Sequence, residues 1–233
     1  MPSTAPSGVE PVPVRRTHAE RSATTRAALL DATIDCLAER GYAGTTTAEV
    51  VKRAGLSRGA QVHHFPTKAL LISAALDRLL RIQRQEFVDR FAALPAASRT
   101  EPEALGVLWT VLDSQAYRAL LQLAVASFAD DDLRESVAGA FLQLERTVLD
   151  TFAETFPDAA ERANADVMAL FAFRALGSAA LYRELGLSRQ ADEMVAMLRM
   201  LSQVKSNALA QASDSWRYGR AASPPATAGD TAR

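Results

Sequence analysis

The sequence predicts an all-α protein in which a small module of short helices precedes a larger domain of long ones. Apolar residues recur every three or four positions in each long segment, and no alternation with a period of two persists. Residues that cap helices, and Gly or Pro residues that end them, separate these segments. The chain has 233 residues, 48% of them hydrophobic and 23% charged, which is enough for a hydrophobic core in one large or two small domains.

The first predicted helix spans roughly residues 21–40. Leu30, Ile34 and Leu37 lie on one face of it, and Gly41 follows at the position where a helix commonly ends in a left-handed residue. The residues before it, 1–18, contain four prolines in a background of small and polar residues. This composition predicts a disordered N-terminal arm.

Two short helices follow, near residues 47–54 and 58–65. Thr46 and Glu49 have the spacing of a capping box at the start of the first of these, and Gly55 ends it. Ser57 is a good N-cap for the second, which Pro66 ends. Two short helices joined by a tight glycine-containing turn form a helix-turn-helix, which we assign with the first helix to a domain of residues 19–67.

Spacing also predicts which side chains of this module are buried and which face outward. The predicted small core consists of Val50, Val51, Ala54, Leu56 and Phe65. The residues left for the outer surface are Arg58, Gly59, Ala60, Gln61, His63 and His64.

Longer helices are predicted from Lys68 onward, after an N-cap at Thr67. Their expected ranges are 68–94, 102–115, 116–129, 131–156, 159–186 and 189–212. The segment 165–185 is apolar almost all round, and the last helix is strongly apolar on one side. Two such neighbouring helices suggest that a second copy of the chain covers part of their surface. Residues 68–212 are therefore assigned to a second domain, and residues 213–233 to a disordered tail.

Composition narrows the classes of function. The longest apolar run without a charge, residues 119–129, is about half of the ~20 residues that a membrane span needs, so no membrane partner is expected. The N-terminus lacks the apolar core of a signal peptide, and the single Cys36 fits a reducing cytoplasm as a buried, inert thiol.

Residues 1–68 carry nine Lys and Arg against six Asp and Glu, whereas the remainder carries 17 against 21. A basic N-terminal module suggests an anionic partner.

The stretch "GYAGTTTAEVVKRAGLSRGAQVHHFPTKALL" resembles a known family. Residues 21–71 are similar to the DNA-binding domain of TetR-family transcriptional regulators, in the helix ending at Gly41-Tyr42, the pair Thr45-Thr46, and Leu56-Ser57. The match continues through Gly59, the "HHF" run, Lys68 and Leu71. The all-helical remainder is similar to the family's effector-binding and dimerisation domain. The resemblance implies a homodimer whose second short helix enters the major groove of a double-stranded DNA operator, and a small-molecule effector that releases the DNA.

The predicted DNA contacts follow from this resemblance and from helix chemistry. The helix N-termini near the two threonines and Lys68 favour phosphates. The predicted set is Thr45, Thr46, Arg58, Gly59, Ala60, Gln61, His63, His64 and Lys68. The N-terminal Arg15 and Arg16 either reach a minor groove or belong to a solvated tail.

This chain departs from the family at three consecutive positions. The family usually has Thr, an aliphatic residue and Tyr where this sequence has Ala60, Gln61 and Val62. Ala60 and Val62 have no hydroxyl group, so the contacts that the Thr and Tyr hydroxyls of the family make with DNA are not expected in this protein. Gln pairs well with adenine and a methyl group with thymine, so we expect Gln61 and Ala60 to read bases.

Other interpretations of the polar motifs are weaker. His63 and His64 diverge by about 100° on a helix and cannot chelate one ion together, and no nucleophile with an orienting carboxylate accompanies them. The acidic run at residues 130–135 fits a helix N-cap better than a metal site. The sequence also lacks a phosphate-binding glycine loop and known hydrolase motifs. No catalytic residue, metal or cofactor is predicted.

Ligand and interface residues are predicted from side-chain type. Aromatic and soft residues on the long helices, Phe173 included, surround the expected core. Buried polar groups are more informative because they must be paired. The predicted ligand-binding residues are Trp109, Tyr117, Gln122, Phe128, Phe141, Met168 and Phe171. The predicted dimer-interface residues are Arg174, Leu181, Met197 and Leu201, with Arg174 as an alternative ligand for an anionic effector.

The leading hypothesis is a ligand-responsive repressor that is not an enzyme. The alternative is an all-α small-molecule-binding protein or enzyme whose helix-turn-helix is only structural. A third interpretation, a helical adaptor for protein partners, rests only on the apolar C-terminal helices. DNA binding at low salt discriminates the first from the second.

Overall fold

The computed structural model describes residues 17–219, and side chains through residue 205. This part of the chain is helical and contains no strand, as the sequence predicts. The first four helices are α1 (His18–Gly44), α2 (Thr47–Ala54), α3 (Arg58–His64) and α4 (Lys68–Ala92). They are followed by η1 (Ala96–Ser98), α5 (Glu101–Leu112), α6 (Gln115–Ala126), η2 (Ser127–Ala129), α7 (Asp131–Thr155), α8 (Pro157–Ala160), α9 (Ala165–Glu184) and α10 (Ser188–Gly219).

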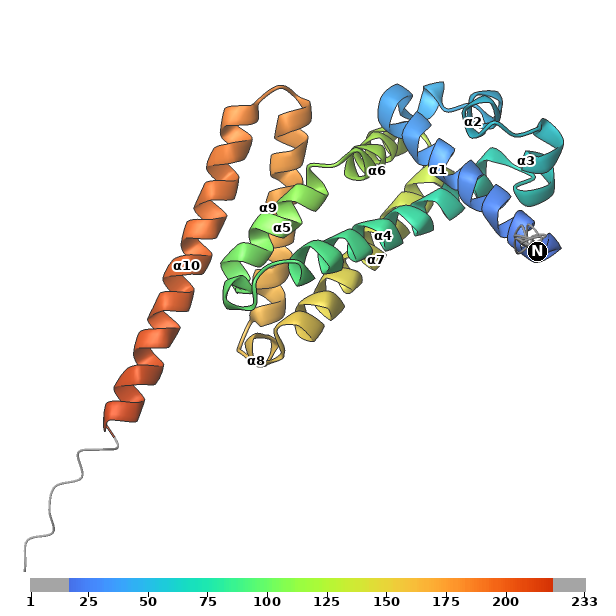
Figure 1. Cartoon of the computed structure of the whole chain (residues 1–233). Coiled ribbons are helices and arrows are strands. Elements are labelled where there is room, and N and C mark those ends of the chain that lie inside the picture. The colour runs from blue at the N-terminus through green and yellow to red at the C-terminus, as the bar shows by residue number, and fades with distance from the viewer. Residues whose placement is uncertain (1–16, 220–233) are drawn as a thin grey trace, which may run out of the picture.

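The helices are arranged along an elongated molecule (Figure 1). The short helices α2 and α3 lie at one end with α1, and the antiparallel pair α9 and α10 lies at the other. The long helices α4 and α7 pack against each other and run between the two ends. One continuous helix, α4, therefore leads from the helix-turn-helix end into the larger domain.

The capping residues identified in the sequence predicted most of the helix boundaries correctly. Thr46, Ser57 and Thr67 are the N-caps of α2, α3 and α4, and Gly55 adopts the left-handed conformation (φ 64°). Asp130 caps α7, where its side chain accepts a hydrogen bond from the Leu133 N–H (2.9 Å). The prediction that the acidic run starts a helix is confirmed.

Several predicted boundaries are wrong. The segment expected as one helix at 159–186 is divided into α8 and α9, because Asn164 adopts a left-handed conformation (φ 61°). The expected arm at 1–18 overlaps α1, since Thr17 forms a capping box with Glu20. At the other end α10 continues to Gly219, beyond its expected end at residue 212. The rest of the predicted arm and tail, including Arg15 and Arg16, lies outside the described residues.

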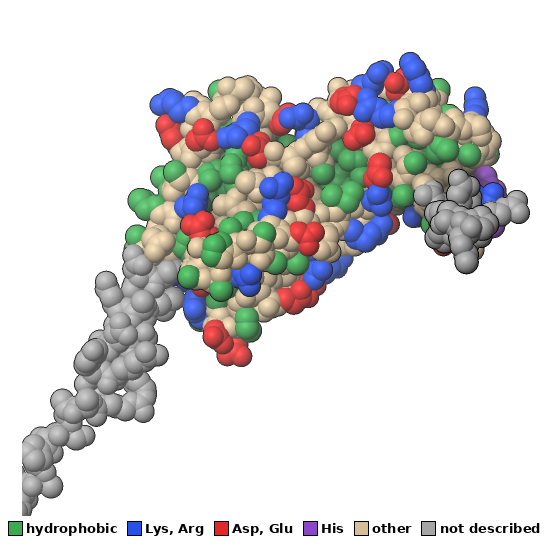
Figure 2. Space-filling view, in the orientation of Figure 1, with side chains coloured by type: hydrophobic (Ala, Val, Ile, Leu, Met, Phe, Trp, Pro, Cys, Tyr) green, Lys and Arg blue, Asp and Glu red, His purple; other side chains and the backbone are tan. Residues whose placement is uncertain are grey.

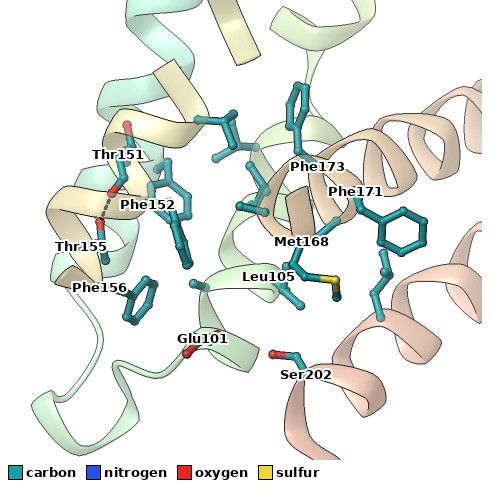
Figure 3. A pocket seen from close by; sticks show the side chains of 18 of the residues that line it. Glu101, Leu105, Thr151, Phe152, Thr155, Phe156, Met168, Phe171, Phe173 and Ser202 are labelled. Carbon is teal, nitrogen blue, oxygen red and sulfur yellow. Dashed lines mark hydrogen bonds between the residues drawn. The ribbon is translucent and has the colours of Figure 1, made fainter. Parts of the chain in front are cut away.

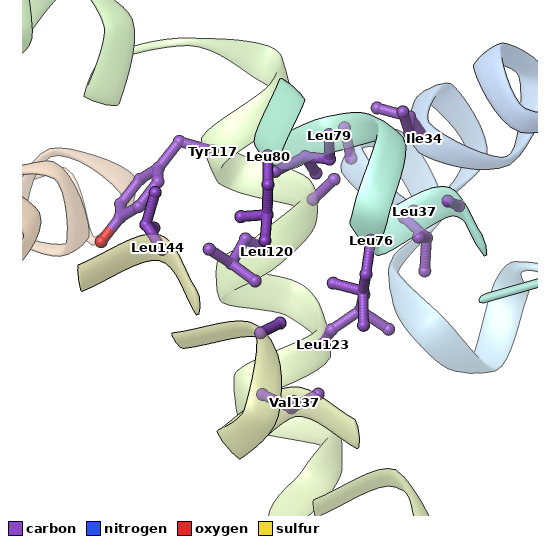
Figure 4. Packing of buried hydrophobic residues seen from close by; sticks show 14 of the residues in the cluster. Ile34, Leu37, Leu76, Leu79, Leu80, Tyr117, Leu120, Leu123, Val137 and Leu144 are labelled. Atoms are coloured by element: carbon purple, nitrogen blue, oxygen red, sulfur yellow. The ribbon is translucent and has the colours of Figure 1, made fainter. Parts of the chain in front are cut away.

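The core lies where α1, α4, α6 and α7 meet (Figure 4). Leu37 of α1, Leu76 and Leu80 of α4, and Leu120 and Leu123 of α6 are almost completely buried there. Because α6 also packs closely along α1, the helix-turn-helix end and the larger domain share a core. Cys36 is fully buried in it, and burial raises the pKa of its thiol, which keeps it protonated.

Among the described residues, α9 is long and apolar enough to cross a membrane, by length and composition only. The core helix of a soluble protein can have the same composition. Here α9 packs against α5, α7 and α10, and its buried residues include Phe173, Leu176 and Ala180. These contacts account for one side of its apolar surface.

Candidate nucleic-acid interface and ligand cavity

The turn between α2 and α3 is held by the hydrogen bonds of a Schellman motif. The Gly55 N–H donates to the Lys52 carbonyl (3.3 Å), and the Leu56 N–H donates to the Val51 carbonyl (3.1 Å). Leu56 is half-buried against the core at this turn. At the next step the Ala60 N–H donates to Ser57 Oγ (3.2 Å), which starts α3. These local bonds set the direction in which α3 leaves α2.

The surface of α3 is a mixture of basic and small residues. Arg58, Gly59, Val62 and His63 are exposed, and His64 is half-buried with its ring against that of His63. Arg58 makes no ion pair with any residue that the structure describes. Figure 2 shows histidine and several basic side chains at this end of the molecule. Such an exposed helix face, with a cation beside small residues, is suited to a DNA groove.

Gln61 does not belong to this face, so the prediction that it lies on the outer surface is wrong, and its position does not favour the predicted contact with a base. Its side chain is 2% exposed, and its Nε2 donates a hydrogen bond to the carbonyl of Phe65. Residues four apart share one side of a helix, so Gln61 points inward with the buried Phe65. The neighbouring Val62, which was excluded as a DNA contact, is 48% exposed instead.

We expect Gln61→Ala to lower the free energy of unfolding by about 1–3 kcal/mol, because it leaves a cavity and removes a buried hydrogen bond. Base preference, measured by selection of sites from random DNA, is expected to stay unchanged. The exposed Val62→Ala is the control, with an expected effect on stability below about 0.5 kcal/mol. A relaxed base preference with unchanged stability in Gln61→Ala would show that the amide reads DNA.

Thr45, another predicted DNA contact, does not lie on the exposed surface. It is buried, and its hydroxyl donates to the Gly41 carbonyl (2.8 Å), which closes the end of α1 after the left-handed Gly41. Thr46 is exposed and accepts the Glu49 N–H (3.2 Å) as the N-cap of α2. The reciprocal half of the predicted capping box is replaced by an ion pair between Glu49 and Arg40 (2.9 Å).

Lys68 joins the start of α4 to the end of α1. Its Nζ donates to the Tyr42 carbonyl (3.0 Å) and lies 3.9 Å from the centre of the Tyr42 ring. Partial burial lowers the pKa of this ammonium. Lys68 therefore connects the helix-turn-helix to the long helix that leads away from it, whether or not it also contacts a phosphate.

Two arginines of the module are engaged within the protein. Arg53 forms an ion pair with Glu39 and lies 3.7 Å from Asp35, and Arg40 pairs with Glu49. These contacts bind α2 to α1. They leave Arg58 and Lys52 as exposed cations of α2 and α3 with no ion-pair partner among the described residues.

A cavity of about 450 Å³ lies in the larger domain (Figure 3). This volume falls in the usual range for small-molecule sites. Side chains of α4, α5, α7, α9 and α10 line it, most of them apolar. Among them are Phe87, Leu108, Phe152, Phe156, Met168, Phe171, Phe173 and Leu198.

Only two of the ligand-binding residues predicted from the sequence line this cavity. Met168 and Phe171 line it, whereas the other predicted ligand residues do not. Phe128 is 77% exposed on η2, and Phe141 is half-buried against the core. The remaining three, Trp109, Tyr117 and Gln122, have other contacts.

Those contacts explain why the three residues are unavailable to a ligand in this cavity. Trp109 lies beneath the guanidinium of Arg183 (4.7 Å), and Gln122 is exposed beside Gly41. Tyr117 is a core residue whose burial raises the pKa of its hydroxyl to about 12. It packs so closely on Gly177 that a Cβ there would lie 2.6 Å from its oxygen.

The most informative residues of the cavity were missed by sequence reasoning. Gln83 and Thr151 are buried polar side chains in its lining, and neither Gln83 Nε2, Gln83 Oε1 nor Thr151 Oγ1 has a hydrogen-bond partner. The signal was available, because Gln83 interrupts the apolar stripe of Leu76, Leu79 and Leu80 at helical spacing.

The predicted interface residues lie on the surface of α9 and α10. Leu181, Met197 and Leu201 are exposed, and Leu201 also borders the cavity. Arg174 is exposed and makes a two-bonded ion pair with Glu145 of α7 (2.8 and 2.9 Å). This hydrogen bonding lowers the pKa of Glu145 and raises that of Arg174. Arg174 is not among the residues that line the cavity.

The fold and these two sites define a helix-turn-helix protein with a separate ligand-sized cavity, and its N-terminal helices match a known family. Residues 29–75 match the family model described as bacterial regulatory proteins, tetR family. The uncharacterized HTH-type transcriptional regulator Rv2912c of Mycobacterium tuberculosis is 34% identical over 148 residues, which cover 61% of this chain and 76% of that protein. The HTH-type transcriptional regulator CymR of Pseudomonas putida is 38% identical over 132 residues, which cover 54% and 62%.

Solved structures show the same fold. A TetR-family transcriptional regulator from Rhodococcus sp. superposes with a TM-score of 0.62 at 17% identity, covering 78% of this chain and 98% of that one. The chain belongs to the TetR family of DNA-binding transcriptional regulators. Because this is a family of regulators, the protein is not an enzyme.

Proposed function

We propose that this regulator is a cytoplasmic homodimeric repressor that binds a palindromic operator and releases it when a small molecule occupies the cavity. In this proposal residues 19–67 bind DNA, and residues 68–212 bind the effector and form the dimer. The observation that carries it is the exposed face of α3, formed by Arg58, Gly59, Val62 and His63. A properly capped turn presents this face at the end of the molecule farthest from α9 and α10.

The dimer is supported by the apolar surface of the last two helices. Large hydrophobic side chains that are exposed on α9 and α10 include Val167, Phe171, Leu181, Tyr182, Met197, Met200, Leu201 and Val204. Monomeric soluble proteins rarely expose so many neighbouring apolar groups. Pairing of α9 and α10 with those of a second copy covers them, and leaves two α3 helices free to enter successive major grooves.

Helix α4 is suited to couple the two sites. It begins at Lys68, which is bonded to Tyr42 of α1, and it supplies Gln83, Arg84 and Phe87 to the cavity. A ligand that is accommodated better in one position of α4 than in another favours the matching separation of the two α3 helices. The effector and the operator then lower each other's affinity by the same factor.

The test is selection of DNA sites from a random pool by the full-length protein, followed by mobility shifts at increasing salt. We expect a palindrome with half-sites about one helical turn, or ~34 Å, apart. Affinity should fall steeply with salt, since basic side chains displace counterions from the phosphates. The particle mass in solution should be that of a dimer. Failure to bind any DNA at low salt would contradict the proposal and favour a structural role for the helix-turn-helix.

A further inference from the structure

We propose that the cavity is selective for an uncharged aromatic molecule with a hydroxyl group, of the phenol class, whose hydroxyl is bound by Gln83 and Thr151. This deepens the proposed function, on which it rests for the role of the cavity as the effector site. The binding preference itself is a property of the protein alone. It follows from the polar groups, the aromatic rings and the charges of the lining.

Gln83 supplies a donor and an acceptor that have no partner within the described residues. The side chain is 3% exposed, and neither Nε2 nor Oε1 makes a hydrogen bond. Burying an amide without partners costs free energy, so native proteins rarely leave both of its atoms unpaired. One hydroxyl group of a ligand can accept from Nε2 and donate to Oε1, or exchange one of these bonds for one with Thr151.

The hydroxyl of Thr151 has no hydrogen-bond partner, unlike the hydroxyls of two other threonines in α7. Threonines within helices commonly donate to the carbonyl four residues earlier. Thr147 donates to Gln143 in this way (2.9 Å), and Thr155 donates to Thr151 (2.6 Å; dashed line in Figure 3). Thr151 is 7% exposed and lines the cavity, yet its own hydroxyl makes no such bond. Its hydroxyl therefore remains available to a ligand.

The two polar side chains lie on neighbouring turns of two helices that pack against each other. Arg84, next to Gln83 on α4, forms an ion pair with Glu154 of α7 (2.7 Å). Thr151 precedes Glu154 by three residues, which is about one helical turn. Both groups therefore border one part of the cavity, where a single polar group of a ligand can reach them.

An aromatic wall extends from this polar part of the cavity. Phe87 lies four residues after Gln83 on α4, and Phe152 follows Thr151 on α7. Phe87 stacks on Phe91 (5.9 Å between ring centres), Phe91 meets the edge of Phe156 (5.5 Å), and Phe156 meets Phe152 (5.8 Å). Phe87, Phe152 and Phe156 all line the cavity. A further ring placed among them gains favourable aromatic contacts in addition to apolar burial.

Each charged group of the lining already has a partner of opposite charge. Glu101 pairs with Arg162 (2.7 Å) and lies 3.6 Å from Lys205, and Arg84 pairs with Glu154. These three, Glu101, Arg84 and Lys205, are the charged residues in the lining. Arg162 and Lys205 share the single carboxylate of Glu101, so each of these charges is engaged in a pair. A carboxylate or ammonium ligand would lose its hydration and would have to displace one of these partners to gain a counter-ion, so the cavity favours a neutral molecule.

The experiment compares three rigid probes of the same shape on the full-length protein without DNA. The probes are 4-phenylphenol, biphenyl and biphenyl-4-carboxylate at pH 7, with affinities measured by calorimetry and by the shift in melting temperature. We expect the phenol to bind at least tenfold more tightly than either other probe. A carboxylate that binds as well as the phenol, equal affinities of phenol and biphenyl, or no binding of any probe would overturn the proposal.

Two substitutions test which side chains bind the hydroxyl group of the phenol. Gln83→Leu and Thr151→Val should each weaken binding of the phenol about tenfold and leave that of biphenyl unchanged or improved. Thr147→Val is the matched control, since Thr147 lies on the same helix and lines the same cavity but already donates within the helix. An equal loss of phenol affinity in Thr147→Val would contradict the assignment.

Failure of this inference is distinguishable from failure of the proposed function. Mobility shifts with selected DNA test operator binding independently of any probe. If the protein binds DNA but does not prefer the phenol, the ligand class is wrong and the regulator proposal stands. If it prefers the phenol but binds no DNA, the proposed function fails and the preference of the cavity is upheld.

Discussion

Leu120→Ala is expected to lower the free energy of unfolding by about 2–5 kcal/mol. Leu120 is fully buried (0% exposed) in the cluster where α1, α4, α6 and α7 meet (Figure 4). Removing three buried carbon atoms there forfeits their transfer free energy and leaves a cavity that close-packed neighbours cannot fill. The midpoint and slope of urea unfolding, followed by circular dichroism, measure the loss.

The control for this core substitution is Leu142→Ala on α7, because the Leu142 side chain is 59% exposed. Its expected effect is below about 0.5 kcal/mol. The slope of the unfolding transition should stay that of the original protein, since the same surface is exposed on unfolding. Equal effects of the two substitutions would mean that Leu120 is not in a close-packed core.

Arg58→Ala is expected to weaken operator binding by about 1–3 kcal/mol for each half-site, without loss of stability. Arg58 is exposed at the start of α3 and forms no ion pair with the described residues. Its guanidinium is therefore free to contact a base edge or a phosphate, and both subunits of a dimer lose that contact together. Mobility shifts with the selected operator measure the change, and thermal unfolding checks that the fold is retained.

Arg146→Ala provides a charge-matched control on α7, away from the helix-turn-helix. It removes the same charge from an exposed position, so any shared effect on affinity reflects net charge alone. If Arg58→Ala and Arg146→Ala weaken binding equally, α3 does not enter the groove. If Arg58→Ala reduces the selectivity for one base position of the operator more than for the other positions, Arg58 contacts a base and not only the DNA backbone.

The sequence predicted the helix-turn-helix well because its signals are local. Thr46, Ser57 and Thr67 cap helices by accepting hydrogen bonds from N–H groups three residues later, and Gly55 supplies a left-handed turn at no steric cost. Each of these effects acts within a few residues along the chain. Where a similar local signal was not considered, at Thr17 and at Asn164, the predicted boundaries were displaced.

The sequence was a poorer guide to which side chains face outward on short helices. Gln61 was assigned to the surface because it was not among the apolar positions assigned to the small core, yet its amide donates to the Phe65 carbonyl and its position is buried. Its spacing of four residues from Phe65 was the better signal, since α3 is too short for a hydrophobic stripe to define a face. A polar side chain that finds a hydrogen-bond partner inside the protein can be buried, as Gln61 is.

The cavity could not be located from residue types for a related reason. Aromatic residues such as Tyr117 and Phe141 are equally suitable for a core and for a cavity wall, and the sequence does not say which has a neighbour on its other side. The sequence shows that Gln83 interrupts an apolar stripe, but Gln83 and Thr151 became ligand-binding candidates only when burial and the absence of a hydrogen-bond partner were known. Both properties depend on helices that are far apart in the chain.

By itself, then, the sequence determined the all-α class, the order of the helices and the capped helix-turn-helix with its resemblance to TetR-family regulators. These follow from hydrogen bonds and side-chain periods that span four residues or fewer. The tertiary structure showed that Val62 rather than Gln61 faces outward, and it alone decided that α4, α5, α7, α9 and α10 enclose a cavity with unpaired polar groups. The physical reason is that burial and hydrogen-bond pairing are properties of packed surfaces, which form only when distant segments meet.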